Sequence, residues 1–134
     1  MTKEHLRILD ANLNRLREGI RVVEDVFRYI YNDAQTASRL KNLRHLSRID
    51  IYNELLSSRD IKNDVLKKTT QSETNREDLY SILIANFKRA QESARVLEEF
   101  GKLLSNETSE KFKYIRYELY DLEIALTNIT SNSK

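Results

Sequence analysis

Asparagine, arginine and glutamate recur at one spacing in two distant parts of this sequence. Asn12, Arg15 and Glu18 form the first set, each three residues after the last. The second set stands 74 residues later and consists of Asn86, Arg89 and Glu92. Arginine can grip a phosphate through a bidentate fork, and a buried amide must be hydrogen-bonded, so both types suit a polar ligand. The structural alternative for each asparagine is a hydrogen bond to the opposite helix or loop.

A loop between the two sets carries a second group of such residues. Arg59, Asp60 and Asp64 fall within the six residues RDIKND. Carboxylates in a polar loop suit Mg²⁺, which prefers oxygen ligands, and the arginine again suits phosphate. About twenty residues here lack any apolar period, and a loop of that length is usually either functional or disordered. A solvated loop without a ligand is the alternative.

Other residues of the repeated stretch are predicted to be structural. On a helical wheel Arg21 and Glu24 face outward, as do Arg95 and Glu98 in the second copy, which is typical of a solvated ladder of ion pairs. Gly19 allows a close approach to the helix backbone, either by a neighbouring helix or by a ligand.

Composition excludes several kinds of chemistry. The 134 residues contain no cysteine, which rules out disulfides and thiolate sites, and two histidines do not favour a histidine-based metal site. The net charge of +2 is too small to indicate binding of nucleic acid. The sequence shows neither a long apolar run nor a leader pattern, so we expect no membrane association and a cytoplasmic location.

Long helices must hold these residues, because the chain has no proline and only two glycines. Apolar residues alternate steps of four and three, which is the heptad spacing of a helix packed along its neighbours. In the first copy they are Leu9, Leu13, Leu16, Ile20, Val23, Phe27 and Ile30. In the second copy they are Leu83, Phe87, Ala90, Ala94, Leu97, Gly101 and Leu104.

The two copies predict an internally repeated fold. Between residues 11–25 and 85–99, seven of fifteen residues are identical, and a second amphipathic run follows each copy. We expect an all-α fold, a four-helix bundle of two duplicated helical hairpins with pseudo-two-fold symmetry. Its single domain, 1–134, would comprise hairpin one at about 4–57, a linker at 58–73, hairpin two at about 74–128 and a polar tail at 129–134.

The predicted helices differ in how their apolar seams continue. The fourth helix keeps a clean seam at Phe112, Ile115, Leu119, Leu122, Leu126 and Ile129. In the second helix Ser47 and Asp50 take the corresponding places, and the seam is predicted to rotate to Leu46, Ile49 and Leu56. Alternatively, Ser47 and Asp50 line a polar cavity. Thr74 and Glu77 form a capping box that is expected to begin the third helix.

Several long segments, taken in order, resemble one known family. They are RILDANLNRLREGIRVVED, LKNLRH, RDIKNDV, ANFKRAQESARVLEEFGKL and IRYELYDLE, and the resemblance extends from Arg7 to about Ala125. The family is the helical hydroxymethylpyrimidine-phosphate kinase domain of thiamin biosynthesis, which occurs alone or fused to thiamin-phosphate synthase. The resemblance implies phosphoryl transfer from ATP to the pyrimidine phosphate, with Mg²⁺ as the metal.

The residues that match the family pattern can be given expected roles, which are our own hypothesis. That pattern has Asn, Arg and Glu in both sets, and an Arg-Asp pair and a later Asp-Val-Gly in the linker, where Leu66 replaces the glycine here. The residues expected to be catalytic are Arg15, Arg59, Asp60 and Arg89, with the arginines holding phosphates. Those expected to bind substrate are Asn12, Glu18, Asn86 and Glu92. The metal is expected on Asp60 and Asp64.

The alternative function is a non-catalytic helical adaptor or regulatory domain of thiamin-phosphate synthase. Tyr114, Tyr117 and Tyr120 are expected to be exposed on the fourth helix and could serve such an interface. A kinase requires the paired sets to converge on a cavity facing the linker, whereas an adaptor would leave them in surface ion pairs. The synthase is therefore one expected partner, and the heptad-rich surface is also compatible with a homodimer.

Overall fold

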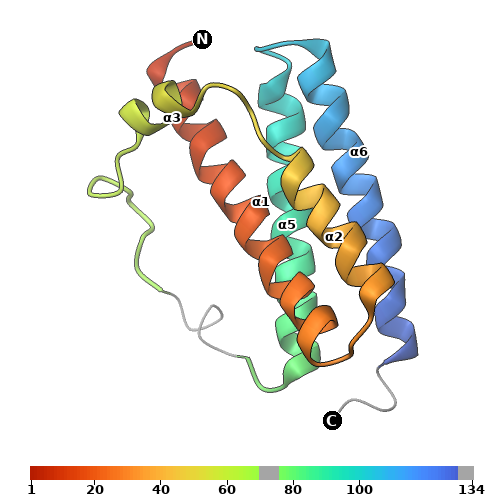
Figure 1. Ribbon diagram of the computed structural model, residues 1–134. Helices are drawn as coiled ribbons and strands as arrows, with labels where there is room; N and C mark the ends of the chain where they lie inside the picture. The colour runs from red at the N-terminus through yellow and green to blue at the C-terminus, as the bar shows by residue number, and fades with distance from the viewer. Residues whose placement is uncertain (70–75, 130–134) are drawn as a thin grey trace.

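Helices make up all the regular structure in residues 1–69 and 76–129, which are the residues that the structure, a computed structural model, describes (Figure 1). In chain order they are α1 (Lys3–Tyr29), α2 (Ala34–Leu46), α3 (Tyr52–Ser58), α5 (Leu79–Gly101), α6 (Asn106–Glu123) and the 3-10 helix η1 (Ile124–Asn128). The predicted all-α class is confirmed. Within these residues, no helix is both long enough and apolar enough to span a bilayer.

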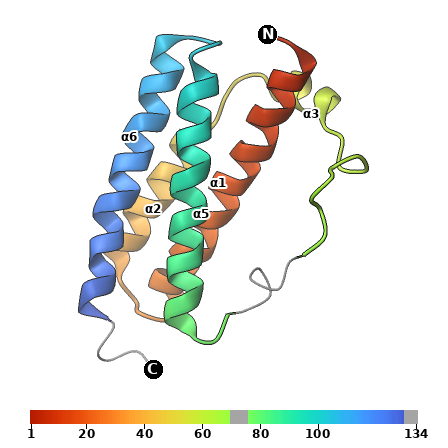
Figure 2. The same ribbon diagram turned by 180° about the vertical axis from the view of Figure 1, so that it is seen from behind.

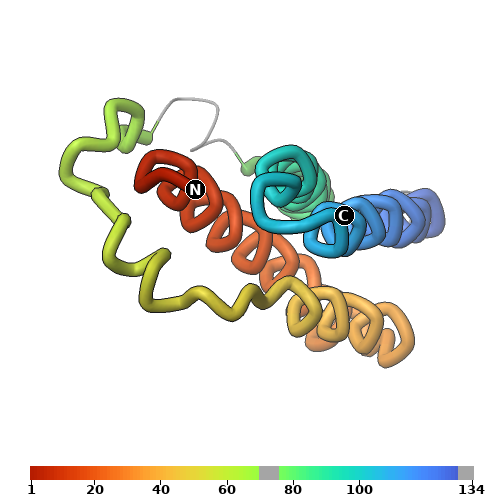
Figure 3. Tube along the Cα trace, turned by 90° about the horizontal axis from the view of Figure 1, so that it is seen from above, coloured from red at the N-terminus to blue at the C-terminus, as the bar shows by residue number. Residues whose placement is uncertain are grey.

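The four longest helices lie side by side, with α1 and α5 as the central pair (Figure 1, Figure 2). These two helices run in opposite directions, while α2 packs along α1 and α6 packs along α5. Viewed from above, residues 47–69 pass around the outer side of α1 (Figure 3). The path brings the first part of the linker back to the α1 side of the central pair.

Side chains cap the first turn of each long helix. Thr2, Asp33, Asp78 and Ser105 each accept a hydrogen bond from the backbone N–H three residues further on. The start of α5 differs from the prediction of a capping box at Thr74 and Glu77, because its N-cap is Asp78 and the helix begins at Leu79. Thr74, the other half of the predicted capping box, lies outside the described residues.

The predicted heptad positions form the core, except at two helix ends. On α1 and α5 they are buried apart from Ile30 and Leu104, whose exposed fractions are 55% and 37%. Along α6 and η1 the predicted seam is buried as far as Leu126, and Ile129 is half-buried. Tyr114, Tyr117 and Tyr120 are exposed on α6, as the sequence predicts.

The two central helices make their closest approach at Gly19. A Cβ atom built there would lie 3.1 Å from the carbonyl oxygen of Asn86 and 3.4 Å from the Cβ of Ala90, both on α5. Of the two predicted reasons for this glycine, close packing of a neighbouring helix is therefore the one that the structure supports.

The second helix is shorter than predicted. Helix α2 ends at Leu46, its C-cap is Ser47, and the chain turns away before α3. The predicted rotation of the seam is wrong, because Leu46 and Leu56 are 41% and 44% exposed. Ser47 and Asp50 instead border a hollow beside α1, as the alternative prediction stated.

The outward orientation predicted for Glu24 and Glu98 is also wrong. The two residues are only 2% and 7% exposed. Glu24 accepts a hydrogen bond of 2.8 Å from Arg44 on α2, and Glu98 accepts one of 2.8 Å from Arg116 on α6. A helix covered by neighbours on two sides buries a wider face than one seam, so these carboxylates lie inside it and need a charged partner.

The outer arginines of the repeat do occupy the exposed positions predicted for them. Arg21 pairs with Asp25 at 3.4 Å, and Arg95 pairs with Glu99 at 2.9 Å. Both arginine side chains are 53% exposed, so these pairs belong to the solvated ladder.

Candidate functional site

Most of the predicted site residues meet on one face of the central helix pair. Helix α1 supplies Asn12, Arg15 and Glu18, and α5 supplies Arg89 and Glu92, around a cavity of about 920 Å³. Residues 61–67 of the linker form the remaining wall. Because α1 and α5 are antiparallel, the two copies of the repeat present their polar flanks to the same hollow.

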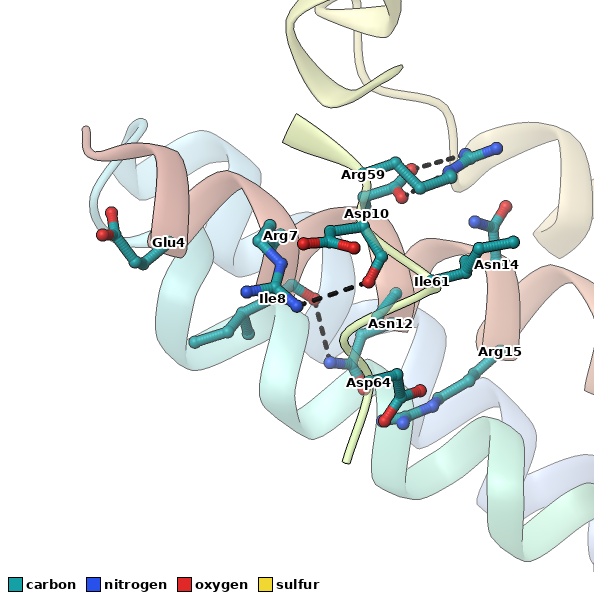
Figure 4. A pocket seen from close by; sticks show the side chains of 12 residues that line it. Glu4, Arg7, Ile8, Asp10, Asn12, Asn14, Arg15, Arg59, Ile61 and Asp64 are labelled. Atoms are coloured by element: carbon teal, nitrogen blue, oxygen red, sulfur yellow. Dashed lines mark hydrogen bonds and ion pairs between the residues drawn. The ribbon is translucent and has the colours of Figure 1, made fainter. Parts of the chain in front are cut away.

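A second hollow of about 580 Å³ continues this face toward the N-terminus of α1 (Figure 4). Its lining shares Asn12, Arg15 and Asp64 with the larger cavity and adds Arg59 and Asp60. Figure 4 shows the Arg15 and Asp64 side chains pointing toward one another across the gap between α1 and the linker. The structure therefore joins the linker set to the helix set, as the sequence predicts.

Two guanidinium groups at this face have no partner among the residues that the structure describes. Arg15 and Arg89 are exposed and make no hydrogen bond or ion pair with any residue among the described parts of the chain. Lys62 and Lys67 also line the larger cavity. Free guanidinium groups beside lysines suit an anionic group, because charge-assisted hydrogen bonds to phosphate or carboxylate are strong.

Arg59 has a different role from that of Arg15 and Arg89. Its Nε donates a hydrogen bond of 2.7 Å to Oδ2 of Asp10, and its Nη2 donates one of 2.7 Å to Oδ1. Asp10 is 6% exposed. The hydrogen bond to Asp10 raises the pKa of Arg59. The bidentate pair attaches the start of the linker to α1, so Arg59 holds the wall of the site in place and is not free for a ligand.

Asp10 is a residue that the sequence reasoning missed. It stands directly after Leu9, at the edge of the apolar seam, where an acidic residue is costly to bury without a partner. An acidic residue beside the apolar seam could have indicated a buried ion pair. Its partner, 49 residues further on, could not be identified from the spacing.

The two asparagines of the repeat make the same local hydrogen bond. The Nδ2 of Asn12 donates to the carbonyl of Ile8 at 2.9 Å, and that of Asn86 donates to the carbonyl of Ile82 at 2.8 Å. Each therefore bonds its own helix and not the opposite helix or loop. Asn12 lines both hollows, whereas Asn86 lines neither and lies at the crossing with Gly19.

The linker carboxylates are already engaged by the loop itself. Asp60 accepts hydrogen bonds from the backbone N–H of Asn63 at 3.1 Å and from its side chain at 2.7 Å. These bonds, the side-chain one first, lower the pKa of Asp60. Asp64 accepts from the backbone N–H of Leu66 at 3.0 Å. Leu66, which replaces the family glycine, is 85% exposed.

These contacts do not present a ready site for Mg²⁺. Within the described residues, Asp60 and Asp64 are not part of any group of three acidic or histidine side chains that could hold a metal ion. Both carboxylates shape the turn of the loop, so no chemical step is assigned to a metal here. The expectation of ATP and Mg²⁺ as cofactors stays a prediction.

Comparison with known proteins gives relatives of much greater length. The chain is 43% identical over 122 residues to the thiamine-phosphate synthase of Thermosynechococcus vestitus, covering 90% of this chain and 35% of that protein. It is 41% identical over 121 residues to that of Synechocystis sp., covering 90% and 35%. For that of Rhodopirellula baltica the figures are 38%, 138 residues, 96% and 37%. No solved structure matches the chain.

These findings contradict the predicted kinase. The relatives carry the name thiamine-phosphate synthase, and none of the three is named a hydroxymethylpyrimidine-phosphate kinase. The prediction of a phosphotransferase is therefore wrong, although the two sets do meet at one cavity as that prediction required, and the alternative, a domain that accompanies the synthase, is better supported. The chain spans between a third and two fifths of the length of these relatives.

One family accounts for nearly the whole chain. The model of the ThiD2 family matches residues 7–125, the same span over which the sequence segments show their resemblance. That span contains all the residues described above at the α1–α5 face. The chain belongs to the ThiD2 family.

Proposed function

We propose that this chain is a non-catalytic regulatory domain of a thiamine-phosphate synthase, and that its α1–α5 face binds a phosphorylated pyrimidine. The names of its relatives, and the fraction of their length that it matches, support the association with the synthase. As a domain of such a protein, it would report the supply of a phosphorylated intermediate to the synthase part.

The observation that supports a phosphorylated ligand is a pair of arginines, Arg15 and Arg89, without partners in the described part of the chain. Arg15 and Arg89 come from different copies of the repeat, line one cavity and have no partner within the described residues. Glu18, Glu92 and Asp64 line the same cavity, yet neither arginine pairs with them, so both guanidinium groups are available to an anion. The cavity of about 920 Å³ is within the range of small-ligand sites.

The same proposal includes the finer fold, a four-helix bundle of two duplicated hairpins. Matching contacts in the two halves support it: Asn12 and Asn86 bond the carbonyl four residues before them. In addition, Glu24 pairs with Arg44 as Glu98 pairs with Arg116. A duplicated fold would explain why both sets of the repeat face one cavity.

Binding can be tested on the chain alone by isothermal titration with hydroxymethylpyrimidine phosphate. We expect Arg15→Gln and Arg89→Gln each to weaken binding about tenfold or more, because a hydrogen bond to a charged group contributes about 1.5–3 kcal/mol. Arg21→Gln is the matched control, since Arg21 lies on the same helix, 53% exposed and paired with Asp25. Equal binding by all three variants would place the ligand elsewhere.

Regulation needs a second measurement. The rate of a purified thiamine-phosphate synthase from the same source would be followed with the chain added, with and without the Arg15→Gln change. A rate that responds to the wild-type chain and not to the variant supports the proposal. A response that is identical for both chains would indicate an adaptor that binds no ligand at this face.

A further inference from the structure

A separate cavity lies on the other side of the Asp10–Arg59 pair. It measures about 710 Å³ and lies between α1, the non-helical residues 47–51 and α3. Asp10, Asn14 and Arg59 line both this cavity and the hollow of Figure 4, so the ion pair forms the partition between them. Neither the repeated sets nor the family resemblance points to this place.

The lining of this cavity combines an apolar wall with cationic and aromatic groups. Its apolar members are Leu13, Ile49 and Leu55, of which the two leucines are 8% and 5% exposed. Its cationic members besides Arg59 are Arg17 and Arg48, and its aromatic member is Tyr52. The other members are polar or acidic: Asp10, Asn14, Ser47, Asp50, Asn53 and Glu54. Small-molecule sites usually set an apolar wall beside convergent polar groups, and this cavity has both.

Arg17 carries an unsatisfied polar atom at this wall. Its Nε is fully buried, and no described residue accepts a hydrogen bond from it. Buried polar atoms are nearly always hydrogen-bonded, since leaving one unpaired costs about 1–3 kcal/mol. The Arg17 side chain is therefore incompletely hydrogen-bonded within the described residues.

The second half of the repeat provides an internal comparison. Gln91 stands 74 residues after Arg17, is 3% exposed and donates a hydrogen bond of 2.8 Å to Glu123 at the end of α6. In the first half, α2 ends at Leu46, so no helix reaches the corresponding place beside Arg17. The cavity therefore stands where the other half has a helix and an acceptor.

Arg17 has no ion-pair partner at this cavity within the described residues, although three carboxylates lie in the lining. Asp10 is neutralised by Arg59 through two hydrogen bonds of 2.7 Å. Asp50, also in the lining, lies near Lys111 of α6, and its charge acts to raise the pKa of Lys111 against the larger lowering caused by burial. Glu54, the third carboxylate of the lining, is exposed and pairs with no described residue. The half-buried Arg17 and the exposed Arg48 are the arginines of the lining that no described carboxylate engages.

We propose that this cavity is a second binding site, and that it takes a small aromatic ring carrying an anionic group such as phosphate or carboxylate. The anion accepts hydrogen bonds from the terminal Nη atoms of the Arg17 guanidinium. The ring packs against the apolar wall formed by Leu13 and Leu55, next to Tyr52. This site is independent of the pyrimidine phosphate site proposed for the α1–α5 face.

Heteronuclear NMR titration of the whole chain with phenyl phosphate tests the site. We expect amide shifts to move at residues 47–55, with little response to inorganic phosphate or to phenol at the same concentration, because the ring and the anion both contribute. Arg17→Gln, which installs the residue found in the second half, should weaken binding about tenfold or more.

Two controls separate this site from its neighbour and from general loss of folding. Arg21→Gln should bind like the wild type, and Arg15→Gln should leave the response of residues 47–55 unchanged while altering that of residues 61–67. A thermal melt of each variant reports folding, and Arg48→Gln gives a second test from the opposite wall. Shifts at residues 47–55 that persist in Arg17→Gln, or that phenyl phosphate never produces, overturn the proposal.

Discussion

Replacing Glu98 with glutamine should destabilise the protein far more than the same replacement at the exposed Glu99. The Glu98 side chain is 9% exposed and accepts three hydrogen bonds. Two come from Arg116, its Nε at 3.0 Å and its Nη2 at 2.8 Å, and one comes from Arg95 at 3.1 Å. Glutamine keeps the size of the side chain but removes the charge that balances a nearly buried guanidinium.

The expected loss follows from the environment of Arg116. Removing one partner of a fully buried ion pair costs about 3–5 kcal/mol, because the remaining charge lies in a poor solvent. Arg116 is 14% exposed and stacks over the rings of Tyr117 and Tyr120, which partly compensates it. Its hydrogen bonds to Tyr120 and Glu98 raise its pKa, so it stays charged. We expect a loss of about 2–3 kcal/mol.

Urea unfolding followed by circular dichroism measures this free energy. Glu99→Gln is the matched control, since it makes the same chemical change one residue further on, at a side chain that is 44% exposed. It should leave the unfolding midpoint almost unchanged. If Glu98→Gln and Glu99→Gln shift the midpoint equally, burial of Glu98 is not what gives the pair its importance.

A double replacement separates the pair from its individual charges. Changing Glu98 and Arg116 together to methionine removes both charges and keeps apolar volume. Such replacements of buried ion pairs are often neutral, so the double variant should be more stable than Glu98→Gln. A double variant as unstable as the single one would mean that the pair itself, and not the unbalanced charge, supplies the stability.

Three further predictions follow from other contacts. Hydrogen bonds from Thr36 lower the pKa of Asp33, so its capping of α2 stabilises the protein above a pH of about 3.8 and is lost as the pH falls below it. Asp33→Ala should therefore lower the free energy of unfolding by about 1 kcal/mol at pH 7. In acid unfolding curves this difference between the variant and the wild type should vanish. Asp10→Asn should release Arg59, seen as faster amide hydrogen exchange in the linker with unchanged exchange in α5. Gly19→Ala should lower the free energy of unfolding by about 1 kcal/mol in urea. Overpacking costs about 1–3 kcal/mol, whereas the better helix propensity of alanine over glycine returns about 1 kcal/mol. A variant that is more stable than the wild type would show that α5 moves aside.

The long helices and their seams could be predicted from the sequence because they rest on local periodicity. Steps of three and four residues identified the core positions of α1, α5 and α6, and failed only at Ile30 and Leu104, where the helices end. The repeat also predicted most of the polar residues that share a face, although Asn86 lies at the helix crossing and lines neither hollow. It did so because antiparallel packing of two copies brings equivalent flanks to one hollow.

A helical wheel does not show contacts between different helices, so these contacts could not be predicted from it. Glu24 and Glu98 were predicted to face solvent because one seam was counted for each helix, while the structure covers α1 and α5 on two sides. The end of α2 at Leu46 was missed because no proline or glycine marks it. The bond from Arg59 to Asp10 was missed because the two residues are 49 positions apart.

The crossing of α1 and α5 has a consequence for how the chain is made. The close contact at Gly19 is with Asn86, so a growing polypeptide must be extended by 67 residues before α1 meets its main partner. At about 5–20 residues per second, translation leaves the apolar stripe of α1 without α5 for about 3–13 seconds. During that interval only α2 and the short α3 can shield it, which makes the first half of the nascent chain a candidate client for chaperones that hold exposed apolar helices.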